Sequence, residues 1–274
     1  MAGDDVHKVA LIQLNGQPDK ADNLRAVTRL VDAVCAAERP ALVALPEMVT
    51  SIGAGREARL AHAETFPDGE MYGLLRGLAR RHRVTLHGGS LLEAGPHGKC
   101  FNTTVVFGPD GVELARYRKL HLFDITTPSG EVFRESDHFA RGEAVAAAPV
   151  FDTTMGLSIC YDLRFPELYQ ALAARGAEII AVPSAFTVET GRDHWEPLLR
   201  ARAIETASWV VAAAQWGPHG DGGRRSYGHS AVVDPWGHVV ARLPDGEGWL
   251  TAHLDRARTA RVRTQIPVHE HKVL

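Results

Sequence analysis

Cysteine is scarce in this 274-residue chain, which has three such residues at wide and irregular spacing. An odd number spaced in this way excludes a disulfide framework and a cysteine-rich zinc site. We therefore expect reduced thiols and a cytoplasmic location. Apolar runs long enough to cross a bilayer are missing. The N-terminal sequence MAGDDVHKVALIQL lacks the basic region, apolar run and cleavage site of a secretory signal, so no membrane association is expected.

An excess of charge of one sign is also missing. Lys and Arg total 30, Asp and Glu total 33, and the formal net charge is -3. This balance gives no broad attraction to nucleic acid or to an anionic membrane. No close cluster of His, Cys, Asp and Glu indicates a metal site, and HGGS at 87–90 lacks the glycine pattern and lysine of a phosphate loop. We expect neither a metal nor an organic cofactor.

What the sequence does contain is one order of elements that occurs twice. Both halves alternate short apolar runs, typical of buried strands, with stretches that carry apolar residues at helical spacing. Each half then closes with a hairpin that turns at a Pro-containing tetrapeptide. The first half predicts strands at 9–14, 41–47 and 84–93, helices at 20–37 and 69–82, and a hairpin turning at 108–111. The second predicts strands at 155–160, 177–186 and 208–215, helices from 166 and at 194–207, and a hairpin turning at 234–237.

Strands that alternate with helices predict an α/β fold. Two similar halves, each with helices outside and a sheet inside, predict a four-layer α-β-β-α sandwich with an internal pseudo-repeat. No linker separates the halves, so residues 1–274 are expected to form a single domain. The segment from Gly217 to Gly228, with five glycines and two arginines, is predicted to be the most mobile loop.

Three residues follow predicted strands at places suited to chemistry. Cys160 lies at a strand-to-helix junction, where helix N-terminal N–H groups stabilise a thiolate. Glu47 lies at the carboxyl end of a buried strand, and Lys119 follows a hairpin strand. Cys35 and Cys100 lie in contexts typical of buried structural cysteines.

For these candidates the residues alone leave alternatives open. An exposed loop glutamate and a solvated surface lysine are the ordinary fates of residues such as Glu47 and Lys119. His121 and His229 are possible bases in a Cys/His arrangement, although the chain has 14 histidines.

Three motifs in this order make the chain similar to the nitrilase superfamily of carbon–nitrogen hydrolases. They are LPEM at 45–48, YRKLHLFD at 117–124 and SICYDLRFPELY at 158–169. The segments RESD at 134–137 and 183–237 resemble the branch that contains deaminated glutathione amidase and omega-amidase. The resemblance extends over nearly the whole chain and agrees with the predicted sandwich. Tyr-Asp after the cysteine, where true nitrilases have Trp-Glu, favours amides over nitriles.

The resemblance implies a catalytic role for each matched residue. Cys160 would attack the amide carbon, with Glu47 as general base. Lys119 and the backbone N–H of Tyr161 would hold the oxyanion. Glu135 would orient Lys119 and the substrate nitrogen. The expected substrate is a small carboxylate-bearing amide, with deaminated glutathione ahead of 2-oxoglutaramate and N-carbamoyl amino acids; an inactive binding protein on the same fold is the non-enzymatic alternative.

Two further expectations concern binding and assembly. Arg164 is a candidate for the substrate's distal carboxylate, because a guanidinium pairs with a carboxylate bidentately; an ion pair with Asp162 or Glu167 is the alternative. Arg224 and Arg225 of the glycine-rich segment are candidates for the leaving-group side. The resemblance also implies a homodimer, with Phe165, Tyr169 and Trp195 as candidate anchors or, alternatively, as core residues of the monomer.

Overall fold

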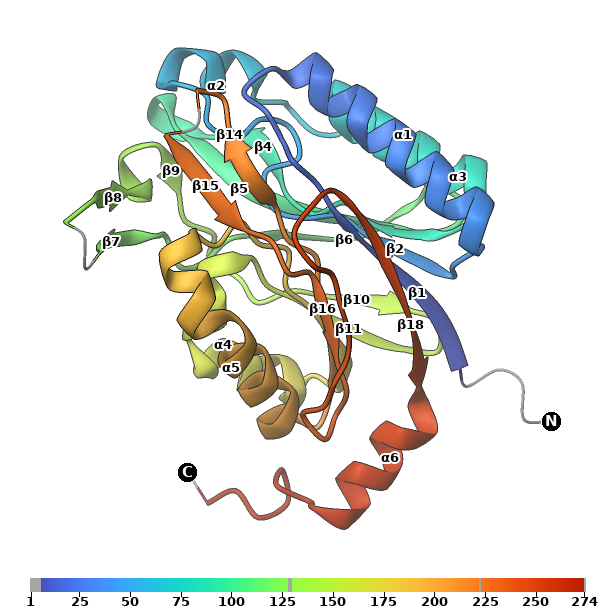
Figure 1. Ribbon diagram of the computed structural model, residues 1–274. Helices are drawn as coiled ribbons and strands as arrows, with labels where there is room; N and C mark the ends of the chain where they lie inside the picture. Colours follow the sequence, from blue (N-terminus) through green and yellow to red (C-terminus); the bar gives the residue numbers. More distant parts are fainter. Residues whose placement is uncertain (1–5, 128–129, 222, 274) are drawn as a thin grey trace.

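A computed structural model of the chain describes residues 6–127, 130–221 and 223–273. Two β-sheets pack face to face, and helices cover their outer faces (Figure 1). The predicted α-β-β-α sandwich is therefore confirmed. The helices are α1 (Lys20–Glu38), α2 (Arg56–His62), α3 (Glu70–His82), α4 (Pro166–Ala174), α5 (Val188–Thr206) and α6 (Arg256–Gln265).

The first sheet has eight strands, and its central strands β1, β2 and β3 are parallel. A strand from the C-terminal end, β18, pairs antiparallel with β1 and closes one side. In sheet order the main path is β18 (Gly248–Asp255), β1 (Val6–Gln13), β2 (Leu42–Ala44), β3 (Thr85–His87), β5 (Cys100–Phe107) and β4 (Leu91–Ala94), with β6 (Glu113–Arg118) and β9 (Phe139–Ala140) pairing β5.

The second sheet has six strands and repeats the plan of the first, with a parallel core that ends in an antiparallel hairpin. Its strands in order are β10 (Ala147–Val150), β11 (Thr153–Leu157), β12 (Ala177–Ala181), β13 (Trp209–Ala212), β16 (Ala231–Val233) and β17 (Val239–Arg242). Two small ribbons stand apart from both sheets: β7 (Asp124–Thr126) with β8 (Val132–Arg134), and β14 (Trp216–His219) with β15 (Arg224–Tyr227).

The alternation of side chains along β1 shows how one strand serves two layers of core. Val9 and Leu11 join the cluster between the two sheets, whereas Ala10 and Ile12 join the cluster beneath α1 and α3. All four side chains are fully buried. Because successive strand residues point to opposite faces, a continuous apolar run is what such a doubly covered strand requires.

Three predictions of local structure were wrong. The predicted strand 84–93 is two strands, β3 and β4, because Gly89 turns the chain with φ 65°. The predicted loop from Gly217 to Gly228 is the β14–β15 ribbon, apart from Gly222, which lies outside the described residues. The helix predicted at 194–207 begins earlier, at Val188, where Thr187 caps it by accepting from the Thr190 N–H.

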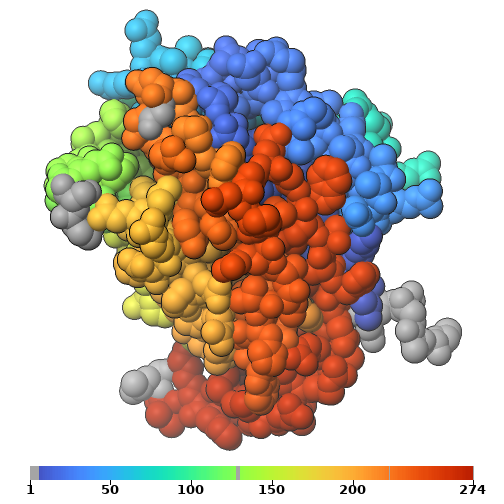
Figure 2. All heavy atoms as spheres, in the orientation of Figure 1, coloured from blue at the N-terminus to red at the C-terminus, as the bar shows by residue number. Residues whose placement is uncertain are grey.

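The C-terminal part of the chain joins the two halves. Figure 2 shows the orange and red residues running down one face, from the N-terminal half at the top to α6 at the bottom. The eight-residue register of β1 with β18 runs from Val6 opposite Asp255 to Gln13 opposite Gly248. Among the helices of the described residues, none is both long and apolar enough to cross a membrane.

Candidate active site

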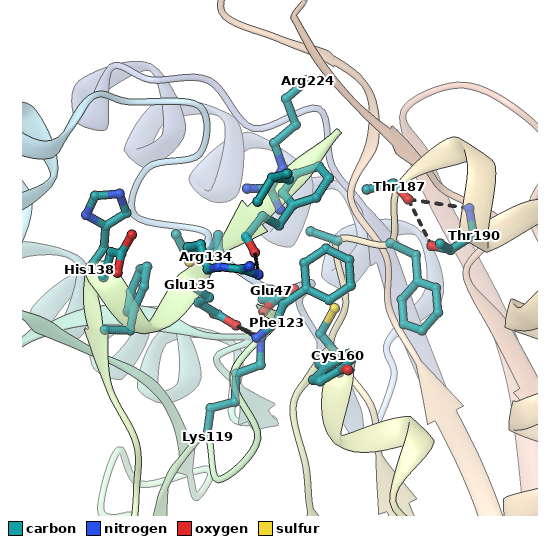
Figure 3. A pocket seen from close by; sticks show the side chains of 18 of the residues that line it. Glu47, Lys119, Phe123, Arg134, Glu135, His138, Cys160, Thr187, Thr190 and Arg224 are labelled. Carbon is teal, nitrogen blue, oxygen red and sulfur yellow. Dashed lines mark hydrogen bonds and ion pairs between the residues drawn. The ribbon is translucent and has the colours of Figure 1, made fainter. Parts of the chain in front are cut away.

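Four of the predicted site residues meet in one cavity of about 440 Å³. Glu47 follows β2, Lys119 follows β6, Glu135 opens the short 3₁₀ helix η2 (Glu135–Asp137), and Cys160 opens the 3₁₀ helix η3 (Cys160–Arg164). Figure 3 shows Glu47 between Glu135 and the sulfur of Cys160, with Lys119 below. Residues more than 100 positions apart in sequence thus converge at one end of the strand layers.

Cys160, the first residue of η3, has a constrained backbone conformation. Its φ of 49° lies in the left-handed region, which is costly for a residue with a side chain. Its backbone N–H donates to the Pro183 carbonyl at 2.9 Å and thereby ties the turn to the strand layer. The predicted junction is confirmed, although the helix that begins at Cys160 is 3₁₀ and α4 starts only at Pro166.

Glu47 is almost completely buried, with 3% of its surface exposed. One carboxylate oxygen accepts from the Asn102 amide at 2.8 Å and from Lys119 Nζ at 3.1 Å. The side chain is also hydrogen-bonded to the Cys160 thiol. The Gln215 amide donates to the Glu47 carbonyl at 2.9 Å, so backbone and side chain are both fixed.

Lys119 is as buried as Glu47 and is held by two carboxylates. Its ammonium donates to both oxygens of Glu135, at 3.0 and 2.9 Å, as well as to Glu47. Glu135 in turn accepts from the Phe123 N–H at 2.5 Å. A buried ammonium with two acidic partners has its charge balanced and its direction set.

These contacts fix the protonation states of the site. Burial acts to raise the pKa of Glu47, but the charge of Lys119 and the hydrogen bond from Cys160 hold it below its ordinary value. Burial and the charge of Glu47 raise the pKa of the Cys160 thiol well above its ordinary value. Burial acts to lower the pKa of Lys119, but the charges of Glu135 and Glu47 raise it overall. At neutral pH a neutral thiol therefore faces an ionised carboxylate and a protonated amine.

Tyr161 and Arg164, the predicted oxyanion and substrate residues, also line the cavity. Tyr161 is the second residue of η3, so its backbone N–H has no acceptor within the helix. The Arg164 guanidinium lies over the rings of Phe186, at 5.4 Å, and Tyr161, at 5.9 Å, and its Nη1 is 3.2 Å from His194 Nδ1.

Asp162 is engaged elsewhere and is not the partner of Arg164. It accepts from the Tyr117 hydroxyl at 2.7 Å and from the Ile159 N–H at 2.9 Å. The His121 ring nitrogen lies 2.7 Å from the same carboxylate, so His121 supports the turn of η3. His229 stacks on Tyr227, and neither histidine lines the cavity.

Two of the predicted dimer anchors belong to the monomer's core. Tyr169 and Trp195 are buried at 0% and 2% exposure, and both contribute to the cluster between the sheets and α5. Phe165 is half-buried and stacks on His121. The alternative that these aromatics fill the protomer is therefore correct for Tyr169 and Trp195.

Sequence reasoning missed Asn102, which contacts Glu47, and Arg59, which lines the cavity. Asn102 is a strand residue with no motif around it, and only the fold brings it to Glu47. Arg59, from the unpredicted helix α2, lines the cavity. Arg224 of β15, a candidate named from the sequence, lines it too. Arg225, named beside Arg224 on the basis of the sequence, is exposed and does not line it.

Comparison with known proteins identifies the family of the chain. The family model for carbon–nitrogen hydrolase matches residues 8–264. Deaminated glutathione amidase of Synechocystis is 38% identical over 270 residues, covering 96% of this chain and 97% of that protein. Omega-amidase NIT2-A of Xenopus laevis is 40% identical, with 97% and 94% covered.

A solved structure agrees as well. The Caenorhabditis elegans NitFhit protein superposes with a TM-score of 0.91 at 38% identity, over 99% of this chain. The chain spans 66% of the length of that protein. On the match of the family model and of these relatives, the chain belongs to the carbon–nitrogen hydrolase family.

Proposed function

We propose that the protein is a thiol amidohydrolase that cleaves the terminal amide of a small carboxylate-bearing substrate. The observation that carries the proposal is the Cys160 thiol hydrogen-bonded to Glu47, which contacts Lys119 inside one cavity. Nucleophile, base and cation are the three groups that acyl transfer from an amide requires.

In the first step the Cys160 sulfur attacks the amide carbon while Glu47 takes the thiol proton. For this step the base must be ionised and the thiol must carry its proton. The lowered pKa of Glu47 keeps the carboxylate ionised, and the raised pKa of Cys160 keeps the thiol protonated. Glu47 then gives the proton to the departing amine nitrogen as the C–N bond breaks. A thioester on Cys160 and a free amine result.

The tetrahedral oxyanion is held by the Lys119 ammonium and the Tyr161 N–H. Lys119 stays protonated because two carboxylates raise its pKa, and Glu135 fixes its position with two hydrogen bonds. One such donor typically lowers the barrier by about 3 to 4 kcal/mol. Water, losing a proton to Glu47, then cleaves the thioester and releases the acid. None of these steps calls on a cofactor.

We propose deaminated glutathione as the substrate, the glutathione analogue in which a ketone replaces the γ-glutamyl amine. Its hydrolysis gives 2-oxoglutarate and cysteinylglycine. Two relatives that cover nearly the whole chain carry the names deaminated glutathione amidase and omega-amidase, which favours the 2-oxo acid acyl group. Arg164 lines the cavity beside Tyr161 and makes no ion pair among the described residues, so it is available for the acyl carboxylate.

The second candidate is omega-amidase activity on 2-oxoglutaramate, which has the same acyl group and loses ammonia. An N-carbamoyl substrate would use the same residues and is distinguished by release of carbon dioxide. An inactive binding protein is disfavoured by the intact contacts among Glu47, Lys119 and Cys160. We further propose that residues 1–274 work as one domain, in the cytoplasm, and as a homodimer.

The test is kcat/KM for the two compounds under identical conditions. We expect the larger value for deaminated glutathione. Arg164→Ala should lower both values, because the acyl group is shared, by about 10- to 100-fold as for one charged hydrogen bond. A larger value for 2-oxoglutaramate would reverse the ranking of substrates, and unchanged rates in Arg164→Ala would remove Arg164 from the site.

A further inference from the structure

The end of the cavity formed by α2 and β15 carries positive charge that the mechanism does not use. Arg59 comes from α2 and Arg224 from β15, and both line the cavity together with His138. Figure 3 shows His138 at the far left and Thr187 and Thr190 at the right, with Glu47 and Cys160 between them and Arg224 above. The segment before α2 touches the ribbon, since a Cβ at Gly53 would lie 3.2 Å from that of His219.

Three nitrogen atoms at this end are buried and unsatisfied. Within the described residues, Arg59 Nη1, Arg224 Nε and His138 Nδ1 have no hydrogen-bond partner. Leaving a buried donor unpaired is costly, and more so when the group is charged. The other amino group of Arg59 donates to the Ala54 carbonyl at 3.0 Å, and its guanidinium lies 5.5 Å from the Phe139 ring centroid. The side chain is thus held in place while one N–H edge remains free.

Electrostatics at this end favour an anion. Burial and the nearby charge of Arg224 lower the pKa of Arg59. The charge of Arg224 also acts on Glu47, so this end adjoins the reacting groups. Across the cavity five cationic side chains face three carboxylates, a formal excess of two positive charges. Lys119 is already paired with Glu47 and Glu135, so the excess resides on the arginines.

We propose that Arg59 and Arg224 form a second anion subsite, which binds a carboxylate on the leaving-group side of the scissile amide. The inference rests on the proposed function and names the feature that selects its substrate. Arg164 lies beside Tyr161 and Phe186, on a different element from Arg59 and Arg224, and arginines at separate places in one cavity suit a substrate with a carboxylate at each end. A peptide leaving group with a free C-terminus has this chemistry, whereas ammonia does not.

The experiment compares three substrates with one acyl group. They are deaminated glutathione, its C-terminal carboxamide and 2-oxoglutaramate, and kcat/KM is measured for each. The variants are Arg59→Gln and Arg224→Gln. The matched controls are Arg56→Gln and Arg225→Gln, exposed arginines of the same two elements that do not line the cavity.

For deaminated glutathione, each subsite variant should lower kcat/KM by about 10- to 100-fold, the range for one hydrogen bond to a charged group. For 2-oxoglutaramate and the carboxamide the change should stay within about twofold. Both controls should behave as wild type. Equal losses on all three substrates, or no loss on deaminated glutathione, would overturn the subsite. Comparing substrates within one variant cancels any fraction of misfolded enzyme.

A binding measurement separates failure of this inference from failure of the proposed function. Calorimetry of the Cys160→Ala variant with deaminated glutathione and with its carboxamide needs no turnover. Tighter binding of the carboxylate, abolished by Arg224→Gln, would support the subsite even if the wild type hydrolyses neither compound. Equal affinity for the two ligands would refute the subsite while leaving the amidase proposal in place.

Discussion

At the scale of residues, the proposed roles of Glu47 and Cys160 predict how activity should depend on pH. Glu47 has a pKa below its ordinary 4.5 and therefore stays ionised above that pH. Cys160 has a pKa above its ordinary 9.0 and stays a thiol below that pH. Lys119, with a pKa raised above 10.5, stays protonated throughout.

The resulting prediction is a flat profile of kcat/KM between about pH 5 and pH 9, because none of the three groups titrates there. Activity should fall on the acid side as Glu47 gains its proton, below pH 4.5. The measurement is a profile in buffers of constant ionic strength. A limb centred near pH 7 would mean that a different group, such as a histidine, controls the reaction.

Substitution of the cysteines gives a second prediction. Cys160→Ala and Cys160→Ser should each lose more than about 1000-fold in kcat, the scale of removing a nucleophile. Serine should fail because Glu47, with its pKa below the ordinary value, is a weak base for an alcohol. Cys35→Ala and Cys100→Ala should keep near wild-type rates, because neither thiol lies at the site. Burial and the charge of Asp32 raise the pKa of Cys35 to about 11, and burial raises the pKa of Cys100, so both stay unreactive thiols. Wild-type turnover by Cys160→Ala would disprove the central assignment.

At the scale of elements, the turn between β3 and β4 supports the loop that carries Glu47. A Cβ at Gly89 would lie 1.9 Å from the Pro46 carbonyl oxygen. The neighbouring Ser90 accepts from the Met48 N–H through its hydroxyl, and its own N–H donates to Pro46. The turn and the loop are therefore one unit.

Gly89→Ala should damage stability and activity together. The left-handed φ of 65° adds strain of about 1–3 kcal/mol for a residue with a side chain. Displacing Pro46 by about 1 Å should cost kcat about 100-fold. Gly73→Ala in α3, with no atom within 4 Å of the added methyl, should stabilise the fold by up to about 1 kcal/mol. Thermal unfolding and kcat of both variants make the check; a fully active Gly89→Ala would uncouple the turn from the site.

The sequence predicted an element best where a regular spacing of apolar residues extended over many positions. The helix predicted at 20–37 is observed as Lys20–Glu38, because its apolar stripe and the Asp19 cap set both face and start. The helix α2 escaped prediction, since its seven residues bury no side chain and leave no periodic signal. The ribbon β14–β15 was not predicted for another reason. Its glycines indicated a loop, but glycines are also the residues that the tight turn of a hairpin requires.

The residues of the candidate site also differ in whether a local sequence pattern marks them. Glu47, Lys119 and Cys160 were found because each lies in a motif at the end of a strand. Asn102, which contacts Glu47, and Arg59, which lines the cavity, were not found, because their places depend on tertiary contacts between elements that no local pattern records.

At the scale of the whole molecule, the homodimer stays a prediction, now with a different surface. With Tyr169 and Trp195 in the core, Ile204 on α5 and Trp236 in the neighbouring turn are exposed large apolar residues, at 51% and 43%. A Cβ at Gly237 would lie 2.6 Å from Ile204, so the two segments touch. Apolar and aromatic groups are enriched at the centres of such interfaces.

Sedimentation equilibrium at micromolar concentration should report about twice the 29.8 kDa of one chain. Ile204→Glu should shift the equilibrium toward the single chain, because a charge would be buried unpaired. The exposed Val112, in the turn between β5 and β6 of the first sheet, gives a control as Val112→Glu. A wild type that sediments as 29.8 kDa alone would refute the dimer.

The pairing of β1 with β18 has a consequence for how the protein is made. The chain leaves the ribosome from its N-terminus, so β1 emerges first and its partner β18 more than 230 residues later. Until then one flank of β1 is an open, apolar strand edge, which is a template for aggregation. Completion of the first sheet waits for synthesis of β18, as expected for a fold of high contact order. Nascent chains released before residue 248 should therefore depend on chaperones far more than the full-length protein does.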